Sequence, residues 1–344
     1  MQHNVARKFK TLALVCVFTS FAGVIYELID EDQVDFSSVM FGLPLGLVFG
    51  LMELFVFPRA EARFREWPFT KLLLFKTFSY TALIYVVTLL VITIVGLIDG
   101  HDIHELMPYV ISIEQWTLVL YTIVVYGLLV FFIQINRLLG QGVLWKFVLG
   151  KYHKPREEER IFMFLDMKSS TTIAERLGHV RFYALLNDLF REISEPVLQT
   201  KAEIYQYIGD EVVLTWNLEE GLRNANCLRI FFMFRENMRR NSDDYFKNFG
   251  VRPEFKAGLH FGKVISAQIG DLKREIAYNG DVLNTTSRIQ NECNKYKRNC
   301  LVSGALMNRL TSTNGFEWER IDAVTLRGKE TEMEIFSVDA TGGF

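Results

Sequence analysis

The stretch Arg160-Ile-Phe-Met-Phe-Leu-Asp-Met-Lys-Ser-Ser-Thr171 decides the fold of the C-terminal half of this chain. Its first six residues form a compact apolar run of strand length, and Asp166 stands where this predicted strand ends. Over Thr172–Gln199, apolar residues recur mostly at three- and four-residue steps, which predicts a helix. A short apolar strand that leads through a small polar loop into a helix predicts a domain of mixed strands and helices.

Two short apolar segments follow that helix. Glu203–Ile208 and Val212–Trp216 flank Gly209-Asp210, a pair of residues that suits a tight hairpin turn. A second helix is predicted over Glu220–Arg240.

Another pair of strands is expected beyond the second helix. Glu254–His260 and Val264–Gly270 would be joined around Phe261-Gly262-Lys263. The resulting order of strand, helix, hairpin, helix and strand (βαββαβ) predicts a split βαβ, ferredoxin-like α+β sheet with its helices on one face.

Two aspartates would meet at one edge of this sheet. Asp166 ends the first strand, and Asp210 lies at the tip of the following hairpin. Paired carboxylates present hard oxygen ligands, which suit two Mg²⁺ or Mn²⁺ ions bound with a nucleoside triphosphate. Either aspartate alone is explained as well by an N-cap or a turn, so the pairing in this strand order carries the interpretation.

The loop after Asp166 is built from small residues. Ser169, Ser170 and Thr171 lead directly into the predicted helix. Small side chains let backbone N–H groups at a helix N-terminus face phosphate oxygens. We therefore predict that these three residues contact the triphosphate.

Three motifs together resemble those of class III adenylyl and guanylyl cyclases. Phe164-Leu-Asp-Met-Lys-Ser-Ser-Thr171 is similar to the FxDxxxST segment that opens their catalytic domain. Tyr207-Ile-Gly-Asp-Glu211 resembles their second metal motif. Gly280-Asp-Val-Leu-Asn-Thr-Thr-Ser-Arg288 resembles their GxxVNxxxR helix, with Leu283 in place of the valine. The resemblance runs from about Glu158 to the C-terminus in the family order.

This resemblance implies roles for particular residues. Asp166 and Asp210 would bind two Mg²⁺ or Mn²⁺ ions, with the carbonyl of Met167 as a further ligand. Asn284 would orient the ribose, and Arg288 would contact phosphate in the transition state. In this family the last two residues are supplied by the other subunit, so the resemblance implies a homodimer.

Base recognition departs from the family pattern. Lys256 matches the lysine that reads adenine in adenylyl cyclases, but its usual Asp or Thr partner is replaced here by Ala277. Tyr278, Asn279, Thr286 or a backbone group would have to substitute. ATP is therefore the expected substrate, with GTP as the alternative.

The C-terminal segment Leu326-Arg-Gly-Lys329 resembles the family loop with a phosphate-binding lysine, and either Arg327 or Lys329 fills that role. The implied activity is a phosphorus–oxygen lyase that converts ATP to 3′,5′-cyclic AMP and pyrophosphate. The alternatives are a guanylate cyclase or a catalytically silent, cyclase-like signalling module.

The N-terminal half is unlike the rest of the chain. Four apolar runs reach the length of about 20 residues needed to span a bilayer as a helix. They are Thr11–Ile29, Ser37–Phe57, Leu72–Ile98 and Trp116–Ile135. We therefore predict a transmembrane anchor and possible sensor in contact with lipid over residues 1–139, a coupling helix over 140–157 and the catalytic domain over 158–344.

Basic residues predict the orientation of the anchor. Lys and Arg precede the first span, separate the second from the third and follow the fourth, whereas Asp30–Phe36 and Asp99–Gln115 contain none. By the positive-inside rule, both termini and the catalytic domain lie in the cytoplasm, with the anchor in the cell or inner membrane. Within the spans, Glu53 and Lys76 either form an ion pair or reach the interface separately.

Composition excludes two further classes of function. The net charge of −2 gives no basic footprint for nucleic acid. The four cysteines have no CxxC spacing, so we expect reduced thiols rather than a metal site or disulfides.

Overall fold

The computed structural model describes most of the chain. It covers residues 2–30, 46–57, 67–98, 112–140, 143–311, 315–325 and 332–342, with the isolated positions Leu43, Phe64 and Pro108. The chain divides into two compact units, Met1–Leu139 and Gly140–Phe344.

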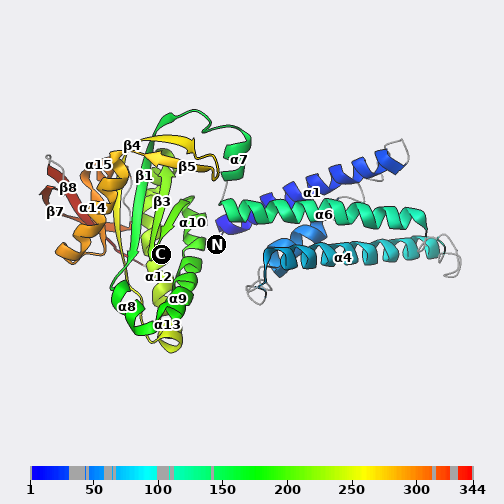
Figure 1. Cartoon of the computed structure of the whole chain (residues 1–344), viewed down its shortest axis with the longest axis horizontal. Coiled ribbons are helices and arrows are strands. Elements are labelled where there is room, and N and C mark those ends of the chain that lie inside the picture. Colours follow the sequence, from blue (N-terminus) through cyan, green and yellow to red (C-terminus); the bar gives the residue numbers. More distant parts are fainter. Residues whose placement is uncertain are drawn as a thin grey trace. The chain divides into compact units, whose positions relative to one another are not determined.

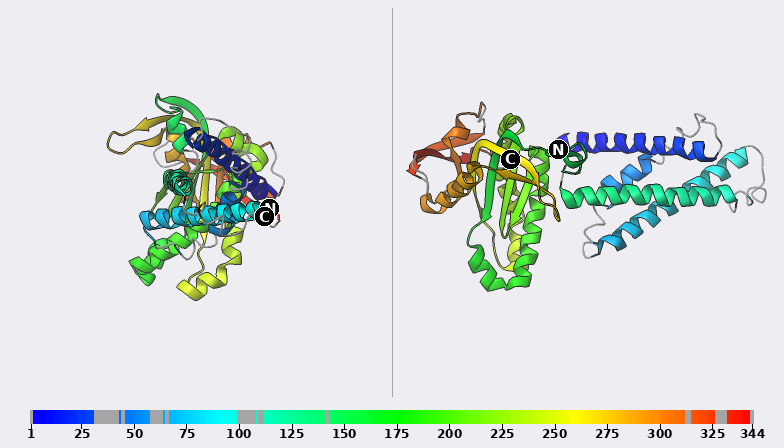
Figure 2. Two further views of the ribbon diagram at one scale, coloured as in Figure 1. Left: turned by 90° about the vertical axis from the view of Figure 1, so that its right-hand side faces the viewer. Right: turned by 45° about the horizontal axis from the view of Figure 1, so that its top comes forward.

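The N-terminal unit is helical, and α4 and α6 pack against each other within it (Figure 2). Its described elements are α1 (Gln2–Asp30), the π-helical turn η1 (Met52–Val56), α4 (Phe69–Ile98) and α6 (Ile113–Leu139).

Two of these helices contain a segment long and apolar enough to cross a membrane. The segments are Phe69–Leu90 and Gln115–Asn136, whereas Leu12–Ile25 and Gly46–Val56 are shorter apolar helices. The first two overlap the third and fourth predicted spans. The four-span anchor as a whole stays a prediction.

The ion pair between Glu53 and Lys76 is confirmed. The Lys76 Nζ lies 3.0 Å from Glu53 Oε1, and the Tyr80 hydroxyl donates to Glu53 Oε2 at 2.7 Å. Lys76 is only 1% exposed, and a charge buried to that extent needs a partner. The pair therefore fixes α4 to the turn that contains η1.

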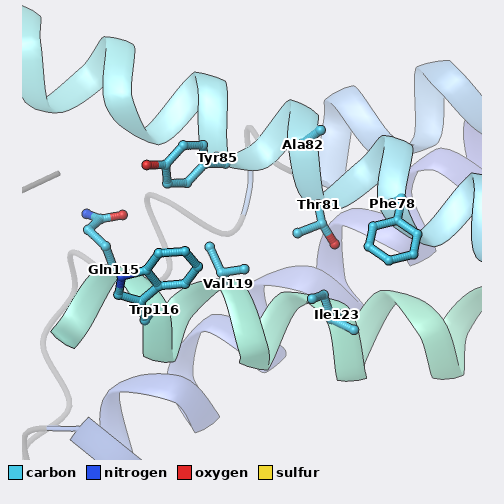
Figure 3. A pocket seen from close by; sticks show the side chains of 8 residues that line it. All are labelled: Phe78, Thr81, Ala82, Tyr85, Gln115, Trp116, Val119 and Ile123. Atoms are coloured by element: carbon cyan, nitrogen blue, oxygen red, sulfur yellow. The ribbon is translucent and has the colours of Figure 1, made fainter. Parts of the chain in front are cut away.

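An apolar cavity of about 310 Å³ lies between α4 and α6 (Figure 3). Its lining consists of Phe78, Thr81, Ala82, Tyr85, Gln115, Trp116, Val119 and Ile123. All of these residues belong to the helical unit.

The C-terminal unit is built on one eight-stranded sheet in the order β2-β3-β1-β4-β6-β8-β7, with β5 paired to β4 (Figure 1). The strands are β1 (Arg156–Met167), β2 (Glu203–Ile208), β3 (Glu211–Asn217), β4 (Phe255–Ile269), β5 (Glu275–Asn279), β6 (Cys300–Ser303), β7 (Phe316–Thr325) and β8 (Glu332–Ala340).

The first four strands of that order, β2-β3-β1-β4, pair antiparallel throughout, which is the ferredoxin-like arrangement that the sequence predicts. The hairpin around Gly209 is also confirmed, and the residue has the positive φ of 63° that favours glycine. A parallel pairing of β4 with β6 extends the sheet and makes it mixed.

The helices in the two predicted helical regions pack on one face of the sheet, as predicted, and α14, which lies beyond the βαββαβ unit, covers the other face. One core joins Ile161, Met163 and Leu165 of β1 to helices α9, α10 and α12. The opposite face carries α14, whose Val282 packs with Phe162 of β1. The central strand β1 is buried on both faces, as expected of a doubly covered sheet. The helices of this unit are α7 (Val143–Val148), α8 (Ser170–Leu177), α9 (His179–Glu192), α10 (Ser194–Thr200), α11 (Leu218–Leu222), α12 (Asn226–Arg240), α13 (Ser242–Phe249), α14 (Asp281–Tyr296) and α15 (Gly304–Met307), with the 3₁₀ turn η2 (Arg223–Ala225).

The predicted turn at Phe261-Gly262-Lys263 is wrong, because no turn interrupts the strand there. These residues lie within β4, a single strand that pairs with β1 through and beyond them. A Cβ at Gly262 would lie 2.6 Å from Val282 Cγ2. The glycine therefore allows α14 to approach the strand closely and does not mark a turn.

The two long predicted helices are interrupted. Gly178, with φ of 74°, separates α8 from α9, and a further break precedes α10. The second prediction splits at Asn224 and Ala225, which have positive φ values of 52° and 51°. Apolar spacing continues across such breaks because each piece packs on the same sheet face.

Arg160 anchors the sheet face that α14 covers. Its side chain is fully buried and donates to Thr215 Oγ1 at 3.0 Å, Asn217 Oδ1 at 3.0 Å and Glu203 Oε2 at 2.9 Å. The guanidinium also lies 4.6 Å from the centre of the Tyr278 ring. β1, β3, β2 and β5 are thus joined through one buried cation.

The same Glu203 Oε2 also lies 2.8 Å from Lys146 Nζ of α7. Burial alone would raise the pKa of Glu203, but Arg160 and Lys146 outweigh it and hold the pKa below its ordinary value of 4.5. The short helix before the sheet is therefore tied to β2 by charge. The four cysteines are free and buried, as expected of reduced thiols.

Candidate active site

The two aspartates singled out by the sequence are brought together. Asp166 lies near the end of β1, and Asp210 lies in the turn between β2 and β3. Because Leu165 pairs with Val212 across β1 and β3, that turn lies beside Asp166. Burial and the neighbouring Asp166 raise the pKa of Asp210, as expected of two carboxyl groups that share one site.

Asp166 has two further partners that hold its side chain. Lys256 lies directly opposite on β4, and its Nζ is 3.2 Å from Asp166 Oδ2. Gln290 Nε2 of α14 donates to the same oxygen at 2.8 Å. One carboxylate oxygen therefore faces a cation and an amide, both supplied by buried side chains.

Glu211 is a third acidic group that sequence reasoning missed. Burial, with Asp166 and Asp210 nearby, raises its pKa to about 7. The residue follows Asp210 directly in the hairpin motif, and that adjacency is the signal in the sequence that could have identified it.

These residues fit a divalent cation. Asp210 Oδ2 is buried and has no hydrogen-bond partner in the described part of the chain. A buried, unpartnered carboxylate oxygen is unfavourable unless a cation binds it. Among the described residues, no group of three or more His, Cys, Asp or Glu side chains could hold a metal ion without other ligands. Further ligands would therefore be the Met167 carbonyl, water and substrate phosphates, which suits Mg²⁺.

The predicted phosphate loop follows directly. Ser169 has a positive φ of 55° and precedes α8, which begins at Ser170. Ser170 also lies near enough to Asp210 to lower its pKa in part, against the larger effect of burial. Thr171 is exposed in the first turn of this helix.

Asn284 and Arg288 lie four residues apart on α14, so their side chains share one side of the helix. Asn284 is exposed and Arg288 is partly exposed. Two residues of helix turn the side-chain direction by about 200°. Arg288 therefore points away from the helix face that carries Gln290 and contacts Asp166.

The residues around the expected base site differ in exposure. Ala277 lies on β5 opposite Ala267. Of its possible substitutes, Tyr278 is buried beneath Arg160, and the Thr286 hydroxyl donates to Val282 O at 2.7 Å. Asn279 is exposed and is the substitute with an accessible side chain. The loop residues Arg327 and Lys329 lie outside the described residues.

The geometry agrees with comparisons to known proteins. The sequence model of one protein family, the adenylate and guanylate cyclase catalytic domain, matches residues 152–340. This chain belongs to that family. The resemblance drawn from the three motifs is confirmed.

Curated relatives of this cyclase-family chain include adenylate cyclases. Adenylate cyclase 2 of Rhizobium meliloti (strain 1021) is 33% identical over 220 residues, which cover 64% of this chain and 61% of that protein. The adenylate cyclase of Anabaena cylindrica is 24% identical over 185 residues, covering 52% of this chain and 36% of that protein. The chain thus matches less than two thirds of the length of either relative.

A solved structure shares the fold. A bacterial light-regulated adenylyl cyclase superimposes with a TM-score of 0.54 at 18% identity, covering 64% of this chain and 65% of that one. At this level of identity the likeness concerns the fold of the cyclase unit.

Proposed function

We propose that the chain is a membrane-bound adenylate cyclase that converts ATP to 3′,5′-cyclic AMP and pyrophosphate in a homodimer. The observation that carries the proposal is the convergence of Asp166 and Asp210, with a buried Asp210 oxygen that has no hydrogen-bond partner among the described residues. The adenylate cyclases among its relatives favour ATP over GTP.

The carboxylates of Asp166 and Asp210 would hold two Mg²⁺ or Mn²⁺ ions, with the Met167 carbonyl as a further ligand. When bound, such ions neutralise the triphosphate and lower the pKa of the ribose 3′-hydroxyl. The acidic side chains create the negative charge that favours cation binding, and the Lys256 ammonium, 3.2 Å from Asp166, offsets part of it.

The remaining residues position the substrate and stabilise charge. The 3′-hydroxyl releases its proton to water, and its oxygen forms a bond to the α-phosphorus while the bond between that phosphorus and the pyrophosphate oxygen breaks. Asn284 would orient the ribose, and Arg288 would stabilise the charge that develops on phosphate. Backbone groups at Ser169 to Thr171 would hold phosphate oxygens. Catalysis of this kind consists of positioning and electrostatic stabilisation.

The direction of α14 supports a homodimer. Gln290 contacts Asp166 of its own chain, whereas Arg288, two residues earlier, points about 200° around the helix. One chain therefore does not bring its own Arg288 to its own aspartates. A second copy related by twofold symmetry would complete both sites.

The helical unit would anchor this dimer in lipid with the cyclase unit in the cytoplasm. Large apolar side chains on α1, α4 and α6 are exposed, among them Val17 at 71%, Phe78 at 62% and Leu120 at 65%. Exposed apolar surface on long helices suits a hydrocarbon environment.

The test uses the purified full chain in lipid nanodiscs with Mn²⁺ and either ATP or GTP. We expect cyclic AMP as the main product by chromatography and mass spectrometry. Asp166→Ala and Asp210→Ala should each lower kcat by at least about 100-fold, the scale reported for the loss of a key electrostatic group.

The matched control is Asp243→Ala, which removes an aspartate that is 95% exposed and has no proposed role in the active site. It should retain the wild-type rate. Undiminished cyclic nucleotide formation by either active-site variant would contradict the proposal, and cyclic GMP as the main product would reassign the base.

A further inference from the structure

We propose that Gln290 is a positioning residue for Asp166. Through this contact, α14 of each subunit would couple metal binding at its own site to the placement of Asn284 and Arg288 at the other. The inference rests on the proposed function, because it takes Asp166 as a metal ligand and the enzyme as a homodimer.

The contact itself is buried and well formed. Gln290 is 2% exposed, and its Nε2 donates to Asp166 Oδ2 at 2.8 Å across a separation of 124 residues. Lys256 Nζ approaches the same oxygen at 3.2 Å. Because both donors contact Oδ2, they fix the orientation of the carboxylate. Groups that orient a metal ligand in this way commonly control metal affinity.

The backbone of Gln290 is held closely against β4. A Cβ at Gly258 would lie 2.3 Å from the backbone N of Gln290, so α14 rests directly on β4 at this point. Three residues further along the helix, the Cys293 thiol donates to the Ala257 carbonyl at 3.4 Å. These contacts hold α14 close to β4, the strand that also carries Lys256.

The same helix carries residues for the second site. Arg288 precedes Gln290 by two positions and points in nearly the opposite direction, since each residue turns a helix by about 100°. A shift of α14 that lengthens the contact between Gln290 and Asp166 therefore also displaces Arg288. Metal occupancy at one site and catalytic alignment at the other are thus coupled through one rigid element.

The first experiment compares Gln290→Met with Asn291→Met in the full-length enzyme. Met nearly matches the volume of Gln but has no donor, and Asn291 is an exposed amide that bonds within the helix to Ser287 O. We would measure Mn²⁺ binding by electron paramagnetic resonance with the α,β-methylene analogue of ATP, which cannot cyclise. Gln290→Met should bind Mn²⁺ about 10-fold more weakly, whereas Asn291→Met should match wild type.

The second experiment separates the two effects in heterodimers purified with two tags. One subunit carries Gln290→Met and its partner carries Arg288→Ala, so the active site that remains uses Asp166 of the partner and Arg288 beside the altered Gln290. We expect a several-fold lower kcat with an unchanged Mn²⁺ requirement. When Gln290→Met and Arg288→Ala share one subunit, the remaining site should instead require more Mn²⁺.

These outcomes distinguish failure of the inference from failure of the proposed function. A wild-type enzyme that forms no cyclic nucleotide would reject the function. An active wild type, together with a folded Gln290→Met variant that binds Mn²⁺ like the control, would overturn the positioning role. If Gln290→Met folds poorly, Gln290→Asn, which is one methylene too short to keep the contact, replaces it with the same expected result. Equal kcat values for the first heterodimer and its counterpart with intact Gln290 would overturn the coupling.

Discussion

Replacing Arg160 with Met should destabilise the cyclase unit more than any exposed arginine does. The change removes three hydrogen bonds of 2.9 to 3.0 Å and the cation above Tyr278, while Glu203 stays partly buried. Breaking a buried ion pair by removing one partner costs about 3–5 kcal/mol. Lys146 still pairs with Glu203, so we expect a value near the lower end, about 3 kcal/mol.

The assay is thermal unfolding of residues 140–344, followed by circular dichroism. For a domain of this size, 1 kcal/mol corresponds to about 2–4 °C, so the expected decrease in Tm is about 6–12 °C. The control is Arg240→Met, which removes a 61% exposed partner of Glu236 and should cost at most about 1 kcal/mol. A Tm for Arg160→Met within about 2 °C of the control would refute the reasoning.

The same network has a pH signature. The pKa of Glu203 is lowered in the folded protein, so its contribution to stability is complete above the ordinary value of 4.5 and is lost as the pH falls through the folded value. Arg160→Met weakens the cause of that shift. The stability gap between wild type and variant should therefore narrow as the pH falls below 4.5, and a gap that widened would contradict the assignment.

Three further predictions follow from the site and its supporting helix. Lys256→Met should lower activity with ATP and GTP alike, because the ammonium pairs with Asp166; a change confined to the ATP-to-GTP ratio would instead support the adenine-reading role. Gly258→Ala should lower the free energy of unfolding by about 1–3 kcal/mol in urea titrations through overpacking against α14, whereas Gly342→Ala, with open space around its Cβ position, should not. Mixing equal amounts of inactive Asp166→Ala and Arg288→Ala chains should restore about a quarter of the wild-type rate, since half of the dimers are mixed and each has one intact site; no recovery after verified subunit exchange would argue against shared sites.

The sequence was sufficient for the elements that depend on local pattern. The strand before Asp166 and the Gly209 hairpin could be predicted because a short apolar run and turn chemistry act over a few residues. The family motifs added the candidate roles of Asn284 and Arg288, which no local pattern would indicate. These motifs were enough to identify the family without knowledge of the three-dimensional structure.

The predictions failed where the role of a residue depends on tertiary packing and not on its neighbours in sequence. Gly262 was interpreted as a turn, although it makes room for Val282 on a continuous strand. No local sequence pattern indicated the contact made by Gln290, because its partner, Asp166, is 124 residues away in sequence. Contacts of that range depend on which face of the sheet a helix covers, and apolar periodicity does not encode that choice.

The shared use of Glu203 by Arg160 and Lys146 also bears on where a shortened protein could begin. A fragment starting after Leu149 would keep every strand of the sheet yet discard the ammonium that α7 contributes to β2. Such a fragment would be expected to melt at a lower temperature, and its kinetics would describe a cyclase unit whose outer edge has been loosened.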